Sequence, residues 1–123
     1  MKTIEVVAAV ILKDNQVLTT QRGYGDLQGR WEFPGGKIES GEDHKAALSR
    51  EIQEELDVQI TVGDFLTTVE YDYPNFHLIM HAYQCELLGE FHLQEHSAAR
   101  WLNLENLYDV DWLEADSVSY THL

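Results

Sequence analysis

Long apolar runs separated by short polar stretches predict a sheet. Ile4 to Leu12 is almost unbroken in hydrophobic residues and rich in valine and isoleucine, which is typical of a strand covered on both faces. The polar segment Lys13–Gln16 predicts a turn, and Val17–Gln21 a returning strand. Two further strands, Phe65–Tyr73 and His77–Leu88, lie on either side of a Pro-Asn pair, so we expect them to form an antiparallel pair.

Shorter elements connect these strands. Arg22–Arg30 contains three glycines and predicts a loop. Gly63-Asp64 predicts a turn that separates Gln59–Val62 from the strand beginning at Phe65. Near the end of the chain, Arg100–Leu102 predicts a short strand and Glu114–His122 a last helix.

One segment has helical periodicity. Ala47, Leu48, Ile52 and Leu56 recur at helical spacing and would face a core. With strands before and after this helix, and with no repeat, low-complexity tract or linker, the economical prediction is a single α/β domain over residues 1–123. Its mixed sheet would lie between helices.

The same helix carries a group of acidic residues. Glu51, Glu54 and Glu55 fall on a face next to the apolar one, because residues three and four apart are neighbours on a helix. Like charges so close raise each other's pKa, which is costly unless something cationic lies among them. Mg²⁺ takes oxygen ligands and completes its shell with water and substrate phosphates. The alternative is an ordinary solvated helix face, but the glycine-rich loop before the helix and Arg50 beside the glutamates favour metal-assisted phosphate chemistry.

Charge restricts the class of partner. Eight Lys and Arg against 22 Asp and Glu give a net charge of −14, which disfavours nucleic acid or an anionic membrane as the main partner. A polyphosphate would also be repelled unless it arrives with metal. The single cysteine, Cys85, excludes an internal disulfide, and residues 1–20 lack the order of a signal peptide. No apolar run approaches membrane-spanning length, so we expect a cytoplasmic protein.

The glycine loop and glutamate helix together resemble the Nudix box. Read as G-x5-E-x7-R-E-U-x-E-E-x-G-U, with U aliphatic, the pattern lacks only its second glycine, which Asp57 replaces. An aspartate adopts the left-handed conformation at a helix end at modest cost. The preceding sequence, WEFPGGKIE from Trp31 to Glu39, resembles MutT-type enzymes, and RWLNLENL with DWLEAD resembles the branch that includes CTP pyrophosphohydrolases. The matching positions of the box are Gly36, Glu42, Arg50, Glu51, Ile52, Glu54, Glu55 and Val58.

The resemblance implies a fold, a reaction and a ligand set. Nudix domains are α/β/α sandwiches that use Mg²⁺ or Mn²⁺, and MutT-like members hydrolyse nucleoside triphosphates to the monophosphate and pyrophosphate by attack of water on phosphorus. Glu51, Glu54 and Glu55 would be metal ligands together with the Gly36 carbonyl. Glu42 and Arg50 would pair to brace the loop against the helix, and Arg50 is placed with the catalytic group for that reason. The general base is either Glu54 or Glu95, which matches a further glutamate in MutT-like enzymes that can also bind metal.

Substrate contacts are expected outside the box. Arg22 matches an arginine that contacts phosphate in MutT-like proteins, and Lys37 is a second candidate cation at the opening of the box. Tyr73 and Phe33 are candidates for the base pocket. Asp116 corresponds to a base-reading Asn or Asp; its carboxyl accepts when ionised and donates only when protonated, so it suits the exocyclic amine of cytosine or an altered purine. Taken alone, each of these residues could equally be core or surface.

Alternative functions remain at this stage. A Nudix hydrolase could instead act on another diphosphate, such as a dinucleoside polyphosphate or a nucleotide sugar, and a Nudix-fold module could bind a nucleotide without cutting it. The intact glutamates argue against mere binding. The partner would be a small-molecule nucleotide, and the protein a monomer or homodimer. The histidine pairs His77/His81 and His92/His96 lie in extended or irregular segments, where i,i+4 spacing forms no helical metal clamp, so we interpret them as structural.

Overall fold

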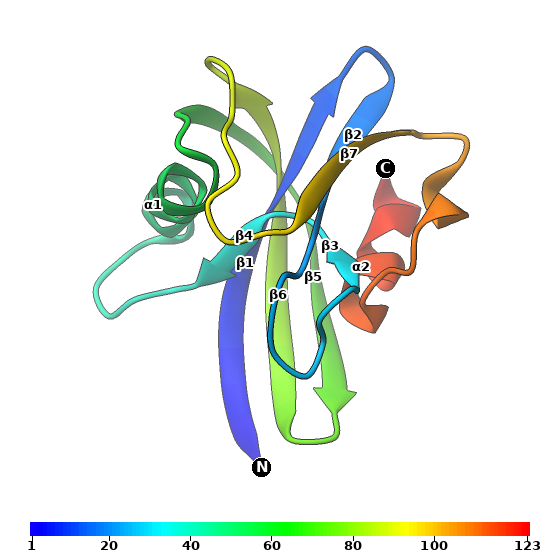
Figure 1. Ribbon diagram of the computed structural model, residues 1–123. Helices are drawn as coiled ribbons and strands as arrows, with labels where there is room; N and C mark the ends of the chain where they lie inside the picture. The colour runs from blue at the N-terminus through cyan, green and yellow to red at the C-terminus, as the bar shows by residue number, and fades with distance from the viewer.

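The structure is a computed structural model that describes residues 1–123, except for the side chain of His122. Within these residues seven strands form one mixed sheet, in the order β3-β2-β1-β6-β5, with β4 paired to β1 and β7 paired to β2 (Figure 1). The strands are β1 Lys2–Lys13, β2 Gln16–Gln21, β3 Trp31–Glu32, β4 Gly35–Lys37, β5 Ile60–Tyr73, β6 Phe76–Leu87 and β7 Ala98–Asn103.

Strand β1 is the centre of the molecule. It runs parallel to β6 and antiparallel to β2 and β4. Val7, Ala9 and Ile11 point into one hydrophobic core, whereas Ala8 and Val10 point into a second core on the other face of the sheet. Because successive side chains serve different cores, nearly every residue of this stretch must be apolar. The prediction of a strand covered on both faces is confirmed.

The long hairpin of β5 and β6 confirms the predicted antiparallel pair but corrects one boundary. Gly63-Asp64 does not form a turn; β5 continues from Ile60 to Tyr73. The register of pairing with β6 instead shifts between Val62 and Phe65, as in a β-bulge. A Cβ at position 63 would lie 3.0 Å from the carbonyl oxygen of Gln84, so glycine here permits close approach of the neighbouring strand. A bulge and a turn use the same residue types, which explains the error.

Helix α1, His44–Leu56, packs on one face of the sheet. Its predicted core residues Ala47, Leu48, Ile52 and Leu56 are fully buried. The helix begins after Asp43, whose Oδ1 accepts a hydrogen bond from the Ala46 N–H at 2.7 Å.

Asp57 ends this helix in place of the usual glycine. It adopts the left-handed conformation, with φ 51° and ψ 45°, and its N–H donates to the Gln53 carbonyl. Its side chain accepts from the Gln53 amide at 3.1 Å, which offsets part of the conformational cost. The expectation for this departure from the box pattern is therefore confirmed.

The opposite face of the sheet is covered by the end of the chain. Helix α2 spans Glu114–Ser119, preceded by the 3₁₀ turn η1 at Leu107–Asp109 and followed by η2 at Tyr120–His122. Figure 1 shows α1 and α2 on opposite sides of the sheet, which confirms the predicted α/β/α sandwich. Among the helices described here, none is long and apolar enough to cross a membrane.

Candidate active site

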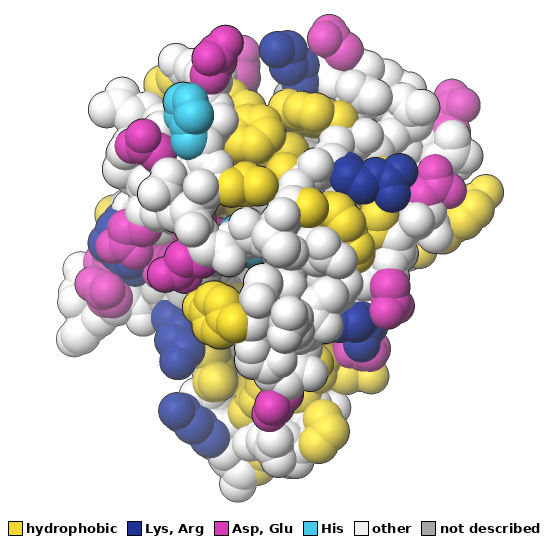
Figure 2. All heavy atoms as spheres, in the orientation of Figure 1, with side chains coloured by type: hydrophobic (Ala, Val, Ile, Leu, Met, Phe, Trp, Pro, Cys, Tyr) yellow, Lys and Arg dark blue, Asp and Glu magenta, His cyan; other side chains and the backbone are white. Residues whose placement is uncertain are grey.

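Two adjoining pockets open on this part of the molecule. One lies between β4, α1 and the loops that follow β2 and β6, and the other lies beside β1, β6 and α2. The first, which we call the acidic pocket, has a volume of about 160 Å³ and is walled by Glu32, Glu55, Glu95 and His96. The second, the aromatic pocket, has a volume of about 400 Å³ and is lined by Phe33, Tyr73, Phe76, Leu113 and Asp116. Arg22, Glu32, Gly35 and Gly36 line both pockets, so the two spaces are joined. In Figure 2 acidic side chains gather at the left of this face, where Figure 1 places α1.

Two glycines shape the acidic pocket by letting other groups approach the backbone. A Cβ at Gly36 would lie 2.3 Å from Oε2 of Glu51, so only glycine lets this carboxylate rest against β4. A Cβ at Gly23 would lie 2.7 Å from the Glu95 carbonyl oxygen, which brings the segment around Glu95 against the loop after β2. Gly23 thus lets the segment of Glu95 reach the acidic pocket, whereas Glu51 rests against β4 outside the lining of that pocket.

Arg50 forms hydrogen bonds with glutamates of the helix and of the loop before it. Its Nε and Nη2 donate to the two carboxylate oxygens of Glu42 at 2.7 and 2.9 Å, and Nη2 also donates to the Lys37 carbonyl at 3.0 Å. Nη1 donates to Glu51 at 2.8 Å and to Glu54 at 3.2 Å. The guanidinium and the Glu39 backbone N–H lower the pKa of Glu42 to about 2. Arg50 therefore joins the loop to the helix through a bidentate ion pair.

The three box glutamates are not equivalent. Glu51 and Glu54 share Arg50, which supplies the cation expected among these carboxylates. Glu55 instead lines the acidic pocket, where its Oε2 accepts from the Gly35 N–H at 3.4 Å. For the side chains described, the three carboxylates do not bring ligand atoms within 4.8 Å of one another. The geometry thus leaves Glu55 facing the pocket while Arg50 holds its two neighbours.

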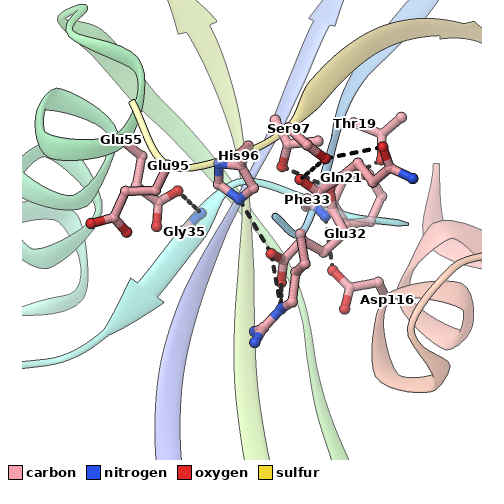
Figure 3. A network of polar contacts seen from close by, with 12 residues as sticks. Thr19, Gln21, Glu32, Phe33, Gly35, Glu55, Glu95, His96, Ser97 and Asp116 are labelled. Atoms are coloured by element: carbon pink, nitrogen blue, oxygen red, sulfur yellow. Dashed lines mark hydrogen bonds and ion pairs between the residues drawn. The ribbon is translucent and has the colours of Figure 1, made fainter. Parts of the chain in front are cut away.

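Glu55 has the most perturbed carboxyl of the acidic pocket. Burial raises its pKa to about 9, and the nearby charges of Glu32, Glu51 and Glu95 add to the effect (Figure 3). The hydrogen bond from Gly35 opposes this shift only in part. Without a cation, therefore, the folded protein favours a proton on Glu55 at neutral pH.

Glu32 and His96 were not anticipated as site residues. Glu32 accepts from Arg22 Nε at 3.1 Å and contacts His96 Nε2 at 3.3 Å. His96 Nδ1 is buried, and no hydrogen-bond partner is found for it among the described residues. The side chain of His96 is only 9% exposed, so this nitrogen is a polar group left open in the site. The sequence signal for His96 was its position directly after Glu95, which is itself a predicted site residue.

The predicted cations lie at the junction of the pockets. Arg22 lies at the end of β2 and lines both, but its guanidinium is paired with Glu32. Lys37, at the end of β4, lines the aromatic pocket. Glu95 lies across the acidic pocket, where its Oε2 accepts from the Tyr24 hydroxyl at 3.3 Å.

The aromatic pocket joins residues from β3, β5 and α2. Asp116 is 4% exposed, and its Oδ2 accepts from the Phe33 N–H at 2.9 Å. Burial raises the pKa of Asp116 well above its ordinary value, and the Glu32 charge raises it further. The Tyr73 hydroxyl accepts from the Ala115 N–H at 3.1 Å, so α2 is tied to both β3 and β5. Phe33, Tyr73 and Asp116, which are far apart in sequence, therefore line one cavity.

Comparison with known proteins identifies this arrangement. A model of the NUDIX domain matches residues 2–122. The chain belongs to the Nudix family. A CTP pyrophosphohydrolase of Escherichia coli K12 is 36% identical over 118 residues, which cover 94% of this chain and 87% of that protein. An 8-oxo-dGTP diphosphatase of the same strain is 29% identical, covering 94% of this chain and 92% of that protein. The crystal structure of a MutT Nudix hydrolase from Burkholderia pseudomallei has a TM-score of 0.91 at 24% identity, covering 100% of this chain and 99% of that one.

Membership of the Nudix family confirms several predictions. The family, the α/β fold and the assignment as a Nudix hydrolase of nucleotide diphosphate bonds agree with these comparisons. Nudix hydrolases generally use a divalent metal ion. The crystal structure at 24% identity supports the fold alone.

Proposed function

We propose that residues 1–123 form one Nudix domain that acts as a Mg²⁺-dependent nucleoside triphosphate pyrophosphohydrolase. The observation that carries the proposal is the junction of an acidic pocket beside the box helix with an aromatic pocket of about 400 Å³. This volume suits a small ligand such as a nucleobase with its sugar. The triphosphate would then extend past Arg22 into the acidic pocket.

The acidic pocket and the box helix beside it together offer a donor set that suits Mg²⁺ or Mn²⁺. The proposed ligands are all oxygens, which a hard cation that keeps part of its water shell prefers. Glu55 gives an independent reason: a buried carboxyl among other carboxylates keeps its proton unless a cation replaces it. When bound, the metal supplies positive charge to the phosphate oxygens. The residues proposed to hold it are Gly36 through its carbonyl, Glu51, Glu54, Glu55 and Glu95.

The reaction needs a positioned water and a base. The water oxygen bonds to the β-phosphorus while the bond from that phosphorus to the α–β bridging oxygen breaks. The nucleoside monophosphate leaves with the bridging oxygen, and pyrophosphate carries the oxygen from water. Either Glu54 or Glu95 accepts the proton of the attacking water. Glu54 has the more accessible carboxylate, 57% exposed, whereas Glu95 faces the acidic pocket directly.

Cations must offset the charge of the substrate in a protein of net charge −14. Arg22 is proposed to contact the phosphates. To do so, its guanidinium must leave the ion pair with Glu32 and pair with the substrate instead. Lys37 is proposed as a second phosphate contact, because it lines the same pocket. The nucleotide would reach the site as its magnesium complex, which reduces the repulsion.

Asp116 is proposed to read the base. A protonated carboxyl offers one O–H donor while its other oxygen still accepts. Cytosine presents the complementary pair, a ring nitrogen acceptor next to an amino donor. This chemistry agrees with the CTP pyrophosphohydrolase among the relatives, while the 8-oxo-dGTP diphosphatase among them supports an oxidised purine. We expect activity on one or both classes of triphosphate, by a monomer or homodimer in the cytoplasm.

The test is a panel of nucleoside triphosphates with identified products. The panel includes CTP, dCTP, 8-oxo-dGTP, the common triphosphates, a dinucleoside polyphosphate and a nucleotide sugar. We expect the highest kcat/KM for a cytosine or oxidised purine triphosphate, with monophosphate and pyrophosphate in equal amounts. Faster cleavage of a nucleotide sugar or a dinucleoside polyphosphate would overturn the proposal in favour of another Nudix substrate.

A further inference from the structure

A second group of potential metal ligands lies outside both pockets. Glu5 on β1, His44 at the start of α1 and His81 on β6 each offer a ligand atom, and these atoms all lie within 4.8 Å of one another. In the part of the chain whose side chains are described, this is the one such group of His, Cys, Asp or Glu residues. None of the three lines the acidic or the aromatic pocket.

The three side chains are already in close contact. Nε2 of His81 lies 2.6 Å from Oε2 of Glu5, and the rings of His44 and His81 stack with centroids 4.2 Å apart at 24°. The His81 side chain is only 13% exposed, whereas Glu5 is 50% exposed. The group is thus held against the sheet and opens to solvent beside the Glu5 carboxylate.

Each imidazole has its other nitrogen occupied by a hydroxyl group. His81 Nδ1 lies 2.8 Å from Thr68 Oγ1, and His44 Nδ1 lies 2.8 Å from the Tyr83 hydroxyl. Histidines that bind metal commonly use their second ring nitrogen in this way, which fixes the ring orientation and tautomer. Here the arrangement leaves Nε2 of each ring as the nitrogen available to a metal.

We propose that Glu5, His44 and His81 form a binding site for a transition-metal dication such as Zn²⁺, separate from the catalytic metal site. Two imidazoles and one carboxylate suit Zn²⁺, Co²⁺ or Ni²⁺ better than Mg²⁺, which prefers oxygen ligands alone. Zinc bonds of about 2.0–2.2 Å at tetrahedral angles place ligand atoms roughly 3.3 Å apart. The present separations, 2.6 Å for His81–Glu5 and at most 4.8 Å overall, lie on both sides of that value, so the side chains must rotate and the stacked imidazole rings must turn to share one ion.

A bound ion would replace the hydrogen bond between His81 Nε2 and Glu5 Oε2. With Nε2 taken by the ion, His81 would carry its proton on Nδ1 and donate it to Thr68 Oγ1. The ion would join β1 and β6 to the first residue of α1, the helix that carries the box glutamates. We therefore expect Zn²⁺ to raise the melting temperature of the metal-free protein.

The test is a calorimetric titration of the full chain with ZnCl₂, in excess Mg²⁺ so that the oxygen-rich site is occupied. We expect one Zn²⁺ per chain at the tightest site. His44→Gln and His81→Gln should each weaken it by at least about 10–100-fold, the loss typical when even an outer contact of a metal site is removed. Thr68→Val, at an exposed position, should weaken it by about 10-fold through loss of the Nδ1 contact.

His77→Gln is the matched control. His77 lies on the same strand and also contacts carboxylates, Asp72 at 2.6 Å and Glu70 at 2.9 Å, but it belongs to no group of three ligands. Its replacement should leave zinc affinity unchanged. As a second readout, bound Co²⁺ should give a visible absorption band that disappears in His44→Gln and His81→Gln. Unchanged affinity in the His81 variant, or an equal loss in the His77 variant, would overturn the proposal.

Discussion

The acidic and aromatic pockets each contain one carboxyl group whose pKa is raised chiefly by burial, but the groups around it differ. Glu55 lies among Glu32, Glu51 and Glu95, and its pKa of about 9 reflects burial together with their charges. Asp116 lies on α2 and accepts a hydrogen bond from the backbone N–H of Phe33. Burial is the first cause of the raised pKa in both residues.

The difference in surroundings indicates different uses. A cation entering the acidic pocket meets several carboxylates, so it can displace the proton of Glu55 and be held. The aromatic pocket is instead lined mostly by apolar and aromatic side chains, so we expect Asp116 to keep its proton and to donate it to a base. On this proposal, burial serves metal binding in one pocket and base recognition in the next.

The largest effect should come from the glutamates of the box helix. Glu54→Gln should lower kcat by about 10³-fold for every triphosphate, because it removes a metal ligand or base without changing side-chain size. The comparison with Glu95→Gln identifies the base. The base is the residue whose replacement lowers kcat more while metal affinity stays unchanged. Steady-state kinetics with pyrophosphate detection measures both.

Glu39→Gln is the control for this prediction. Glu39 also lies near Arg50, at 3.6 Å, and is 66% exposed, but it lies in the loop before α1 and is not among the proposed metal ligands. It should retain nearly full activity. A Glu54 variant as active as the parent would contradict the role of the box glutamates.

Glu55→Gln should stabilise the protein when metal is absent. The folded state holds the Glu55 proton up to a pKa of about 9, whereas the unfolded chain releases it near the ordinary value of 4.5. Between these values the folded state binds more protons, so this group reduces stability as pH rises. In chelator, the variant should match the parent near pH 5 and exceed its unfolding free energy by about 2 kcal/mol at pH 8. Urea unfolding at both pH values checks the sign, and parallel pH profiles for the two proteins would contradict it.

Substitution of Asp116 should change the ranking of bases rather than the overall rate. Asp116→Ala should alter the ratio of kcat/KM between CTP and 8-oxo-dGTP by about 10-fold, the effect of one or two hydrogen bonds. Asp116→Asn keeps a donor and an acceptor, so it should preserve the ranking if the native carboxyl is protonated. An unchanged ranking in the alanine variant would remove Asp116 from base recognition.

The smallest effect tests how α2 is attached to the aromatic pocket. Tyr73→Phe leaves the Ala115 N–H without the hydroxyl that accepts its hydrogen bond, which should cost about 1–2 kcal/mol of stability. Tyr108→Phe is the control, since Tyr108 is 75% exposed and should change nothing measurable. Equal unfolding free energies for both variants would show that this bond does not hold the helix.

The box helix and the loop before it were more predictable from sequence than either pocket. Gly36, Glu42, Arg50 and the box glutamates lie within 23 residues, so helical spacing and the box pattern place them without tertiary information. The unbroken apolar run of β1 likewise indicated that its successive side chains pack into cores on opposite faces of the sheet. The bulge at Gly63 was not, because it uses the residues of a turn.

Contacts between distant segments had no comparable signal. Glu32 and His96 are 64 residues apart and meet only because β3 and the loop before β7 both lie beside β2. His81 was interpreted as structural from its spacing to His77, whereas its closest partners are Glu5 and His44. Sequence spacing predicts which residues are neighbours within one helix or strand, whereas these groups combine residues from several elements.

The most direct test of the central claim is product analysis with and without metal. Purified protein is incubated with its preferred triphosphate in H₂¹⁸O, with Mg²⁺ or with excess chelator, and the products are separated and weighed by mass spectrometry. The account predicts equal amounts of monophosphate and pyrophosphate with the label in pyrophosphate, and no turnover in chelator. Diphosphate and orthophosphate as products, label in the monophosphate, or full activity in chelator would contradict it.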